Sequence, residues 1–236
     1  MKSALLTPVA VVALTCLSWN VLAEETAAKP VEQKPVEAQP LATAAPVEES
    51  APNYPAAWFR VDTDILSTQL WFGATWALSD SVGLATDIYV VGTTGEFDLG
   101  VTLTQGAFSI TPMAGLAFNF GTGKFASLAA PQLYTIVNGK KLYFESWIQV
   151  FFNDMFNKGN ALDQFYTRNF LLWKFNDMFA LGPEVELTWN MRNADENGAD
   201  AVPSLPVGLM AQMNYGEKNT LGLFLGYETM SDDGDP

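Results

Sequence analysis

Polar and apolar residues alternate along most of the chain between Trp58 and Tyr227. Two clear runs are Val185 to Met191 and Phe97 to Leu103, in which every second residue is apolar. A strand with this pattern presents one apolar face and one polar face. The repeated pattern predicts an all-β fold with strands near residues 65–78, 82–91, 96–105, 108–120, 128–137, 141–152, 165–176, 183–192, 205–215 and 219–229.

The first residues have the pattern of a secretory signal peptide. Lys2 precedes an apolar run over residues 4–17, and Val21-Leu22-Ala23 suits a signal peptidase. The apolar run is too short to span a membrane, so we expect residues 1–23 to be removed. Cys16 leaves lipoprotein processing as an alternative, although the residues before it lack the small side chain that such processing favours.

In an exported protein, about ten such strands favour a closed barrel with lipid outside and water or polar side chains inside. We therefore predict an antiparallel, up-and-down transmembrane β-barrel of about 8–12 strands, with ten as the best estimate, over residues 54–229. After the leader, no stretch approaches the ~20 apolar residues that a spanning helix needs. Residues 230–236 are predicted to be an acidic C-terminal tail.

Residues 24–53 form a separate block rich in Ala, Pro and Glu, with no aromatic residue before Tyr54. The block contains three similar tetrapeptides, Lys29-Pro30-Val31-Glu32, Lys34-Pro35-Val36-Glu37 and Ala45-Pro46-Val47-Glu48. Such a segment cannot build a core, and we predict a disordered periplasmic linker. A solvated tether is the simplest interpretation, and an arm that docks on the cell wall or on a periplasmic protein is the alternative.

The composition excludes several kinds of partner and site. Once the leader is removed the chain has no cysteine and no histidine, which excludes disulfides and Cys/His zinc sites. Without Lys2 it has 11 basic and 26 acidic residues, a net charge of −15. Nucleic acid is therefore not expected as a partner, because phosphate binding needs clustered Lys and Arg. We expect no cofactor and no metal.

The phase of the alternation assigns a polar set to the barrel interior. The candidate lumen-lining residues are Asp87, Asp98, Glu145, Gln149, Arg168, Lys174, Glu184, Glu186, Arg192 and Glu228. Acidic side chains outnumber basic ones in this set, which would favour cations in an open lumen. The alternative is a packed network of ion pairs that plugs a narrow barrel, because buried charges persist only when they are paired.

The apolar set is assigned to the lipid-facing wall. It includes Leu70, Phe72, Trp76, Leu99, Val101, Leu116, Phe118, Phe120, Ile148, Val150, Leu187, Trp189, Leu221, Leu223 and Leu225. Trp and Tyr near strand ends are expected to form girdles at the membrane interfaces. The candidates are Trp58, Trp76, Tyr89, Tyr134, Tyr143, Trp147, Tyr166, Trp189 and Tyr227.

Residues that favour turns separate the predicted strands. Asn138-Gly139 is the strongest hairpin signal, because both central positions of its preferred turn need positive φ. The pentapeptide Phe152-Asn153-Asp154-Met155-Phe156 recurs as Phe175-Asn176-Asp177-Met178-Phe179. Asn and Asp side chains bond to nearby backbone, so a reused turn at the end of a strand is favoured over a duplicated functional loop.

The sequence gives little support for an enzymatic function. The chain lacks histidine, which excludes Ser-His triads and histidine-based acid–base catalysis. Gly121-Thr122-Gly123-Lys124 lacks the rest of a phosphate-binding loop, and the loop around Asp195 and Asp200 lacks the ligand spacing of an EF-hand. Glu184 and Glu186 lie on one face of a predicted strand, where pore lining or pairing with arginine is the simpler role.

The last predicted strand resembles the C-terminal recognition signal of bacterial outer-membrane barrels. Thr220, Gly222, Leu225 and Tyr227 match its polar, glycine and hydrophobic positions, although nine residues follow where the family ends on an aromatic. The resemblance implies a Gram-negative outer-membrane location, contact with its lipid and insertion by the barrel-assembly machinery. Outer-membrane barrels have short periplasmic turns, yet ten strands would put the longest connections on that side. Either an additional short strand near 58–66 removes the conflict, or the loops are unusual for this class of barrel.

Two functional hypotheses follow. The first is an outer-membrane barrel that acts as a narrow, porin-like channel, with a preference for cations, or as a structural membrane protein with a plugged interior. The alternative is a soluble periplasmic barrel or sandwich that binds an apolar ligand, with its Leu, Phe and Trp faces turned inward. An enzyme is not expected.

Overall fold

The computed structural model describes residues 15–16, 55–63, 68–153, 162–192, 198–215 and 219–230, with side chains at 15, 16, 126, 127 and 192 left aside. The remainder of the predicted leader, the predicted linker 24–53, Asp195 of the loop that lacks EF-hand spacing and most of the predicted tail lie outside these residues. No helix in the described ranges is long and apolar enough to cross a membrane.

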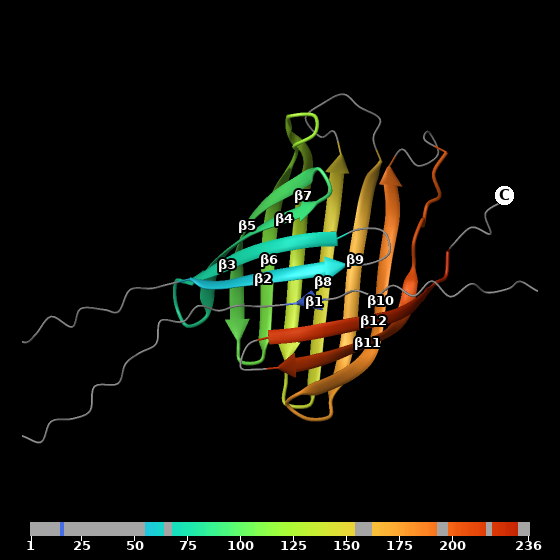
Figure 1. Ribbon diagram of the computed structural model, residues 1–236. Coiled ribbons are helices and arrows are strands. Elements are labelled where there is room, and N and C mark those ends of the chain that lie inside the picture. The colour runs from blue at the N-terminus through green and yellow to red at the C-terminus, as the bar shows by residue number, and fades with distance from the viewer. Residues whose placement is uncertain are drawn as a thin grey trace, which may run out of the picture.

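Twelve antiparallel strands follow one another around a closed barrel, each paired with its sequence neighbour (Figure 1). They are β1 (Thr15–Cys16), β2 (Ala56–Thr63), β3 (Thr68–Ala77), β4 (Val82–Val91), β5 (Thr94–Gln105), β6 (Phe108–Asn119), β7 (Lys124–Asn138), β8 (Leu142–Asn153), β9 (Asp163–Lys174), β10 (Phe179–Arg192), β11 (Pro206–Tyr215) and β12 (Asn219–Glu228). The all-β, up-and-down barrel predicted from the alternation is confirmed. The ten predicted strands correspond to β3–β12, and β2 is the additional short strand near 58–66.

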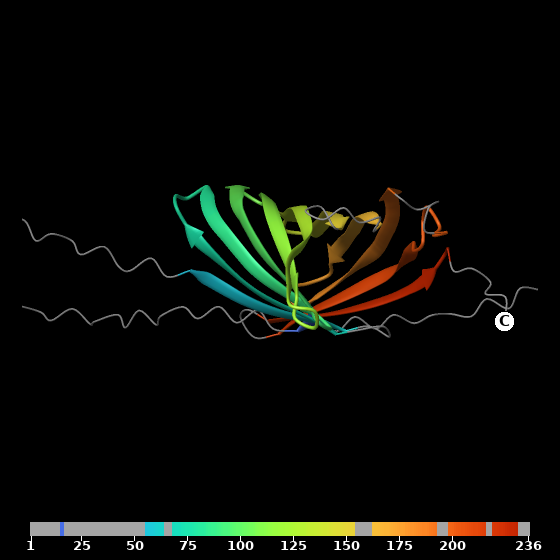
Figure 2. The ribbon, with the colours of Figure 1, turned by 90° about the horizontal axis from the view of Figure 1, so that it is seen from above.

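The barrel closes through β1, a two-residue strand that the sequence pattern did not predict. Thr15 pairs with Gly222 and Cys16 with Leu221 on β12, while Cys16 also pairs with Val61 on β2. Because β1 is antiparallel to both neighbours, β2 and β12 run in the same direction, and one strand separates them. In the view from above, β2 and β12 approach each other on the side of the barrel where β1 lies (Figure 2).

The connections differ at the two ends of the barrel. One end, here the short-turn end, carries the connections 78–81, 106–107, 139–141, 175–178 and 216–218. The other, the long-loop end, carries 64–67, 92–93, 120–123, 154–162 and 193–205. β2 begins at the short-turn end, because Ala56 pairs with Thr75 near the end of β3. With β2 included, the described barrel strands after β1 begin at the short-turn end, opposite the longest connections.

Two predicted turns can be compared with the structure. Gly139 N donates to Leu142 O (2.9 Å) at the predicted hairpin, but its φ is not among the positive ones, so the turn type expected for Asn-Gly is wrong. Positive φ occurs instead at Gly92 and Gly106, which begin the two-residue connections. Neither glycine has an atom within 4 Å of the position of a Cβ, so backbone conformation rather than space requires glycine there.

The repeated pentapeptide serves a turn in its second copy. Asn176 Oδ1 accepts hydrogen bonds from the backbone N–H groups of Met178 and Phe179, both at 2.8 Å, at the short-turn end. In the first copy Asn153 instead donates through Nδ2 to Leu162 O (2.5 Å) at the long-loop end. Asp154 to Phe156 lie outside the described residues. The two copies therefore occupy opposite ends of the barrel.

Apolar side chains cover the outside and charged side chains the inside. On β5, Phe97, Leu99 and Leu103 are 47%, 49% and 45% exposed, whereas the intervening Glu96 and Asp98 are 2% and 0% exposed. The same alternation recurs around the barrel, where the exposed apolar side chains include Phe72, Ile88, Leu116, Leu171, Trp189, Val207, Leu209, Leu223 and Leu225. The assignment of the apolar phase to the outer face therefore holds at these positions.

The aromatic girdle assignment is wrong for most of its candidates. Trp58, Tyr134, Tyr143 and Trp147 line an interior cavity. Tyr89 packs on the buried Trp71, and Tyr166 donates a hydrogen bond to Glu186, so these two residues also face inward. The interior residues among the candidates are therefore Trp58, Tyr89, Tyr134, Tyr143, Trp147 and Tyr166. Trp189 and Tyr227 are exposed on the outer face, as expected. Trp147 shares its phase with Glu145 and Gln149, so the alternation itself places it inside.

Candidate functional site in the barrel interior

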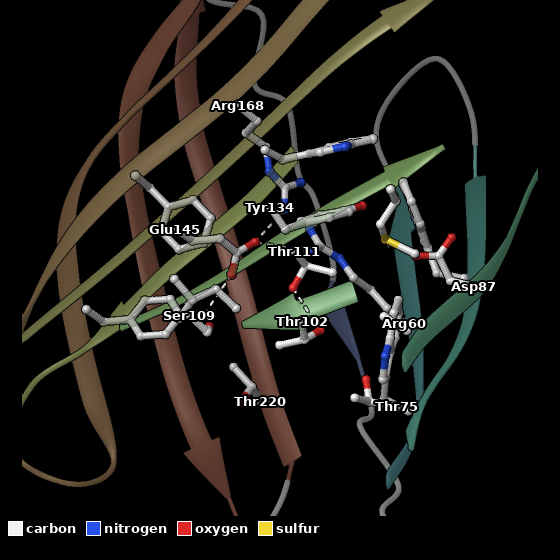
Figure 3. Close-up of a pocket in the computed structure, with 18 of the residues that line it drawn as sticks. Arg60, Thr75, Asp87, Thr102, Ser109, Thr111, Tyr134, Glu145, Arg168 and Thr220 are labelled. Carbon is white, nitrogen blue, oxygen red and sulfur yellow. Dashed lines mark hydrogen bonds and ion pairs between the residues drawn. The ribbon is translucent and has the colours of Figure 1, made fainter. Parts of the chain in front are cut away.

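The main cavity of the described barrel occupies the half of the interior nearer the short-turn end and measures about 450 Å³. Hydroxyl groups form part of its lining, and those of Thr102 and Thr111 are hydrogen-bonded to each other at 2.9 Å (Figure 3). Aromatic rings form much of its wall. Charged side chains complete the lining, namely Arg60, Asp87, Glu145 and Arg168. The cavity therefore combines polar, aromatic and ionic surfaces.

Five charged residues form an arginine network, defined here as Arg60, Asp62, Glu145, Arg168 and Glu184. Arg60 Nη2 lies 2.8 Å from Asp62 Oδ2, and Arg60 Nη1 lies 3.5 Å from Glu145 Oε1. Arg168 approaches Asp62 at 3.4 Å and both Glu145 and Glu184 at 3.7 Å. Each guanidinium thus serves more than one carboxylate, which is the arrangement that buried charges require.

The arginine network joins opposite walls. Arg60 and Asp62 lie on β2, Glu145 on β8 and Arg168 on β9. β2 and β8 are six strands apart in either direction around the ring, so they face each other across the full width of the barrel. The network therefore bridges the interior at this level.

Aromatic side chains cross the interior beside the arginine network. Trp71 on β3 and Trp147 on β8 meet edge to face, with ring centroids 4.9 Å apart. Trp147 also stacks on Tyr134 at 5.6 Å and meets Tyr166 at 5.0 Å. Its Nε1 donates to Gln132 Oε1 at 2.8 Å, so this indole is held by both rings and a hydrogen bond. Ring contacts and ion pairs therefore both cross the interior, from β2 and β3 to β8.

Three other carboxylates form an acidic cluster, defined here as Asp87, Glu96 and Asp98. Asp87 on β4 pairs directly with Asp98 on β5, and Glu96 lies two residues before Asp98 on the same face. Gln149 Nε2 donates to Glu96 Oε1 at 2.6 Å. Asp87 Oδ1 and both oxygens of Asp98 are buried with no hydrogen-bond partner among the described residues.

Gly115 on β6 makes room for the acidic cluster. It pairs with Asp98, and a Cβ at this position would lie 2.2 Å from Asp98 Oδ1 and 2.6 Å from Glu96 Oε1. No ion pair among the described side chains includes a member of the cluster. The described interior thus contains one region in which carboxylates pair with arginines and a separate acidic region in which they do not.

Most of the predicted lumen-lining residues lie on inward-facing positions. Asp87, Asp98, Glu145, Gln149, Arg168 and Glu184 belong to the contacts above, and Glu186 accepts from Tyr166 Oη at 2.9 Å. Lys174 lies at the end of β9, where Nζ donates to Gly139 O (3.0 Å) and to Asn138 Oδ1. Glu228 ends β12 and accepts from Ser204 Oγ and Leu205 N, at 2.6 and 2.7 Å. Arg192 ends β10, with its side chain outside the described ones.

The sequence analysis did not select Arg60, Asp62, Glu96, Gln132 or Trp71. Arg60 and Asp62 belong to β2, which the sequence indicated only as an additional short strand near 58–66 and to which it assigned no face. Glu96 lies two residues before Asp98, so the alternation places both on the same inward face. This pattern could have identified Glu96 from the sequence. In the described part of the chain, no group of three or more acidic, His or Cys residues is placed to hold a metal ion.

The comparisons with known proteins give no family. No protein-family model matches the chain, and no curated protein matches it. Among solved structures, a rhombohedral crystal form of the NanC porin is similar with a TM-score of 0.45 and 7% identity, over 68% of this chain and 93% of that one. The KdgM porin is similar with a TM-score of 0.39 and 10% identity, over 68% and 92%. Function is therefore inferred below from the residues of this barrel.

Proposed function

We propose that this protein is a bacterial outer-membrane barrel. The observation that supports this most is the distribution of side chains, with large apolar groups exposed on the outside and charges buried within. Soluble proteins rarely expose apolar surface that is continuous over many neighbouring strands, whereas lipid requires it. A soluble barrel that binds an apolar ligand requires the reverse orientation, which the described residues do not have.

The proposed orientation has the short-turn end in the periplasm, because membrane barrels have short turns on that side and longer loops outside. β2 begins at this end, so the Pro-rich segment 24–53 would start from the periplasm, where contact with the cell wall or a periplasmic protein is open to it. The main cavity lies in the same half of the barrel. It would therefore form a vestibule on the periplasmic side.

Within the membrane, the proposed role is a narrow, porin-like channel with the arginine network as its constriction. The ion pairs and rings that cross the interior beyond the vestibule support this constriction. Carboxylates outnumber the two arginines among the described interior residues, and a lumen of this kind favours cations. The proposed role is passage of a solute rather than catalysis.

The membrane assignment is tested by extraction and gel mobility. The proposal expects the protein to need detergent for extraction and to migrate at a shifted position in SDS until it is heated. Protein that is soluble in the periplasm and shows no heat-dependent shift would contradict it.

Channel function is tested in planar bilayers. The wild-type protein is expected to give small conductance steps with a reversal potential that favours cations. Arg60→Ala removes the ion pair between β2 and β8 and is expected to increase the conductance, whereas Lys140→Ala, in the exposed turn after β7, leaves it unchanged. If both folded variants and the wild type were silent, the protein would be a structural barrel and not a channel.

A further inference from the structure

We propose that the aromatic-walled cavity binds a small organic cation, an ammonium group with apolar substituents, and that Asp87 supplies its counter-charge. This inference rests on the proposed function only for the membrane location of the barrel. The site consists of Asp87 on β4, the indoles of Trp58 and Trp71, and the Tyr134 and Trp147 rings, all of which line the cavity.

The first argument is the charge of the acidic cluster. Asp87 is 3% exposed and Asp98 0% exposed, and they face each other directly across β4 and β5. The arginines of the barrel interior pair with Asp62, Glu145 and Glu184 instead. Buried carboxylates without a counter-charge are costly, so a cation placed beside Asp87 would offset a cost that the fold now bears.

The second argument is that Asp87 is accessible from the cavity while the rest of the acidic cluster lies behind it. Asp87 lines the cavity, whereas Glu96 and Asp98 do not. Its Oδ1 has no hydrogen-bond partner among the described residues. Figure 3 shows Asp87 on the other side of the cavity from Glu145 and Arg168. Asp87 is therefore the carboxylate that a ligand in the cavity would meet.

The third argument is the aromatic surface beside Asp87. Trp58 pairs with Gly73, and Gly73 pairs in turn with Asp87. A Cβ on Gly73 would lie 2.1 Å from Cε2 of Trp58, so the absence of a side chain lets this indole lie across β3 toward Asp87. Trp71 packs at 4.3 Å on Tyr89 and at 4.9 Å on Trp147. Aromatic faces attract cations, and most strongly those that shed water easily.

These features select an organic cation over the other ligand classes. A metal ion prefers oxygen ligands, and the described residues form no metal-binding group. An anion would meet Asp87, while both arginines are already engaged with carboxylates. A neutral apolar ligand would leave Asp87 uncompensated. The cavity of about 450 Å³ has room for a molecule of the size of choline.

The test uses choline as the probe and 3,3-dimethyl-1-butanol, its uncharged isostere, as the matched compound. The full-length chain, folded in detergent, is titrated by calorimetry and by tryptophan fluorescence. Choline is expected to bind and to change the fluorescence, and the isostere to bind at least about tenfold more weakly, the ratio that corresponds to one lost charge contact. Equal binding of the two compounds, or no binding of choline, would overturn the proposal.

Variants identify the residues responsible. Asp87→Asn keeps the shape of the side chain and is expected to weaken choline binding at least about tenfold without loss of the heat-dependent gel shift. Asp80→Asn, in an exposed turn, is the matched control and is expected to bind as the wild type does. Trp58→Phe is expected to retain binding, whereas Trp58→Leu weakens it. Unchanged affinity in Asp87→Asn would overturn the assignment of the counter-charge.

Conductance separates this proposal from the proposed function. If the barrel conducts but neither binds choline nor is blocked by it, the channel proposal stands and the cation-binding site is wrong. If the barrel binds choline through Asp87 but no variant conducts, the cation-binding site stands and the channel proposal is wrong.

Discussion

Arg60 reaches across the barrel to Glu145, with Nη1 3.5 Å from Oε1, although the two residues lie on strands at opposite points of the ring. A second crossing runs from Arg168 to Asp62, at 3.4 Å. These contacts join side chains from two distant walls of the sheet across the interior. The charged side chains of this interior therefore hold distant strands together, independently of any contact with a solute.

Removal of Arg168 should destabilise the barrel strongly. Its side chain is 7% exposed and serves Asp62, Glu145 and Glu184, so Arg168→Ala leaves Glu184 without an ion-pair partner and leaves Asp62 and Glu145 with Arg60 alone. Breaking a buried ion pair from one side costs about 3–5 kcal/mol of unfolding free energy. Urea unfolding of the folded protein in lipid vesicles, followed by tryptophan fluorescence, measures this loss. Lys140→Ala should stay within about 0.5 kcal/mol of the wild type, and an equally small change for Arg168→Ala would contradict the network.

Gly115 should tolerate no larger residue while Asp98 is present. A Cβ there would lie 2.2 Å from Asp98 Oδ1, and both residues are held by the β5–β6 pairing. Gly115→Ala is expected to lower the unfolding free energy by about 1–3 kcal/mol through overpacking, which the same urea titration detects. Adding Asp98→Ala removes the nearest obstructing atom while Glu96 Oε1 stays in place, so it should restore part of the loss.

Gly121→Ala is the control for Gly115. In its exposed turn the nearest atom to a Cβ is 3.4 Å away, so little change is expected. If the two alanine variants were equally stable, the close approach of the carboxylates to β6 would not be a determinant of stability.

The alternation of residue types predicted most of the fold and only part of the site. It located ten strands and placed Asp87, Asp98 and Glu145 on the inner face. This was possible because strands with two different faces alternate residue types with a period of two, which a single sequence displays. It did not reveal Arg60, since β2 is short and follows a Pro-rich segment. Trp147 was misassigned because residue type was given more weight than phase. The contact between Arg60 and Glu145 depends on which strands face each other, which local periodicity does not contain.

The orientation in the membrane is testable because the mature chain is expected to contain no cysteine. Ala107→Cys places a thiol at the short-turn end, and Ala201→Cys places one at the long-loop end, both at exposed positions. A maleimide that does not cross membranes is expected to label Ala201→Cys in intact cells, and Ala107→Cys only after the outer membrane is permeabilised. The opposite labelling pattern would put the long loops in the periplasm.

The seam between β2 and β12 leads to the last prediction. Val61 and Leu221 both pair with Cys16, which belongs to the predicted leader, and the two flanking strands run in the same direction. Removal of the leader would leave two unpaired strand edges, which hydrocarbon does not tolerate. We therefore expect β2 and β12 to join directly as a parallel pair in the mature barrel.

A double variant, Val61→Cys with Leu221→Cys, reports whether the seam closes. With β1 in place the two positions are separated by two strand spacings, about 9.5 Å, which exceeds the reach of a disulfide. Direct pairing halves this distance, so mild oxidation of the mature, heat-shifting barrel should produce the disulfide, visible as altered mobility after boiling without reductant. Each single variant serves as the control. A folded mature barrel that forms no disulfide, yet is cross-linked by a reagent of about 10 Å, would show that another strand occupies the place of β1.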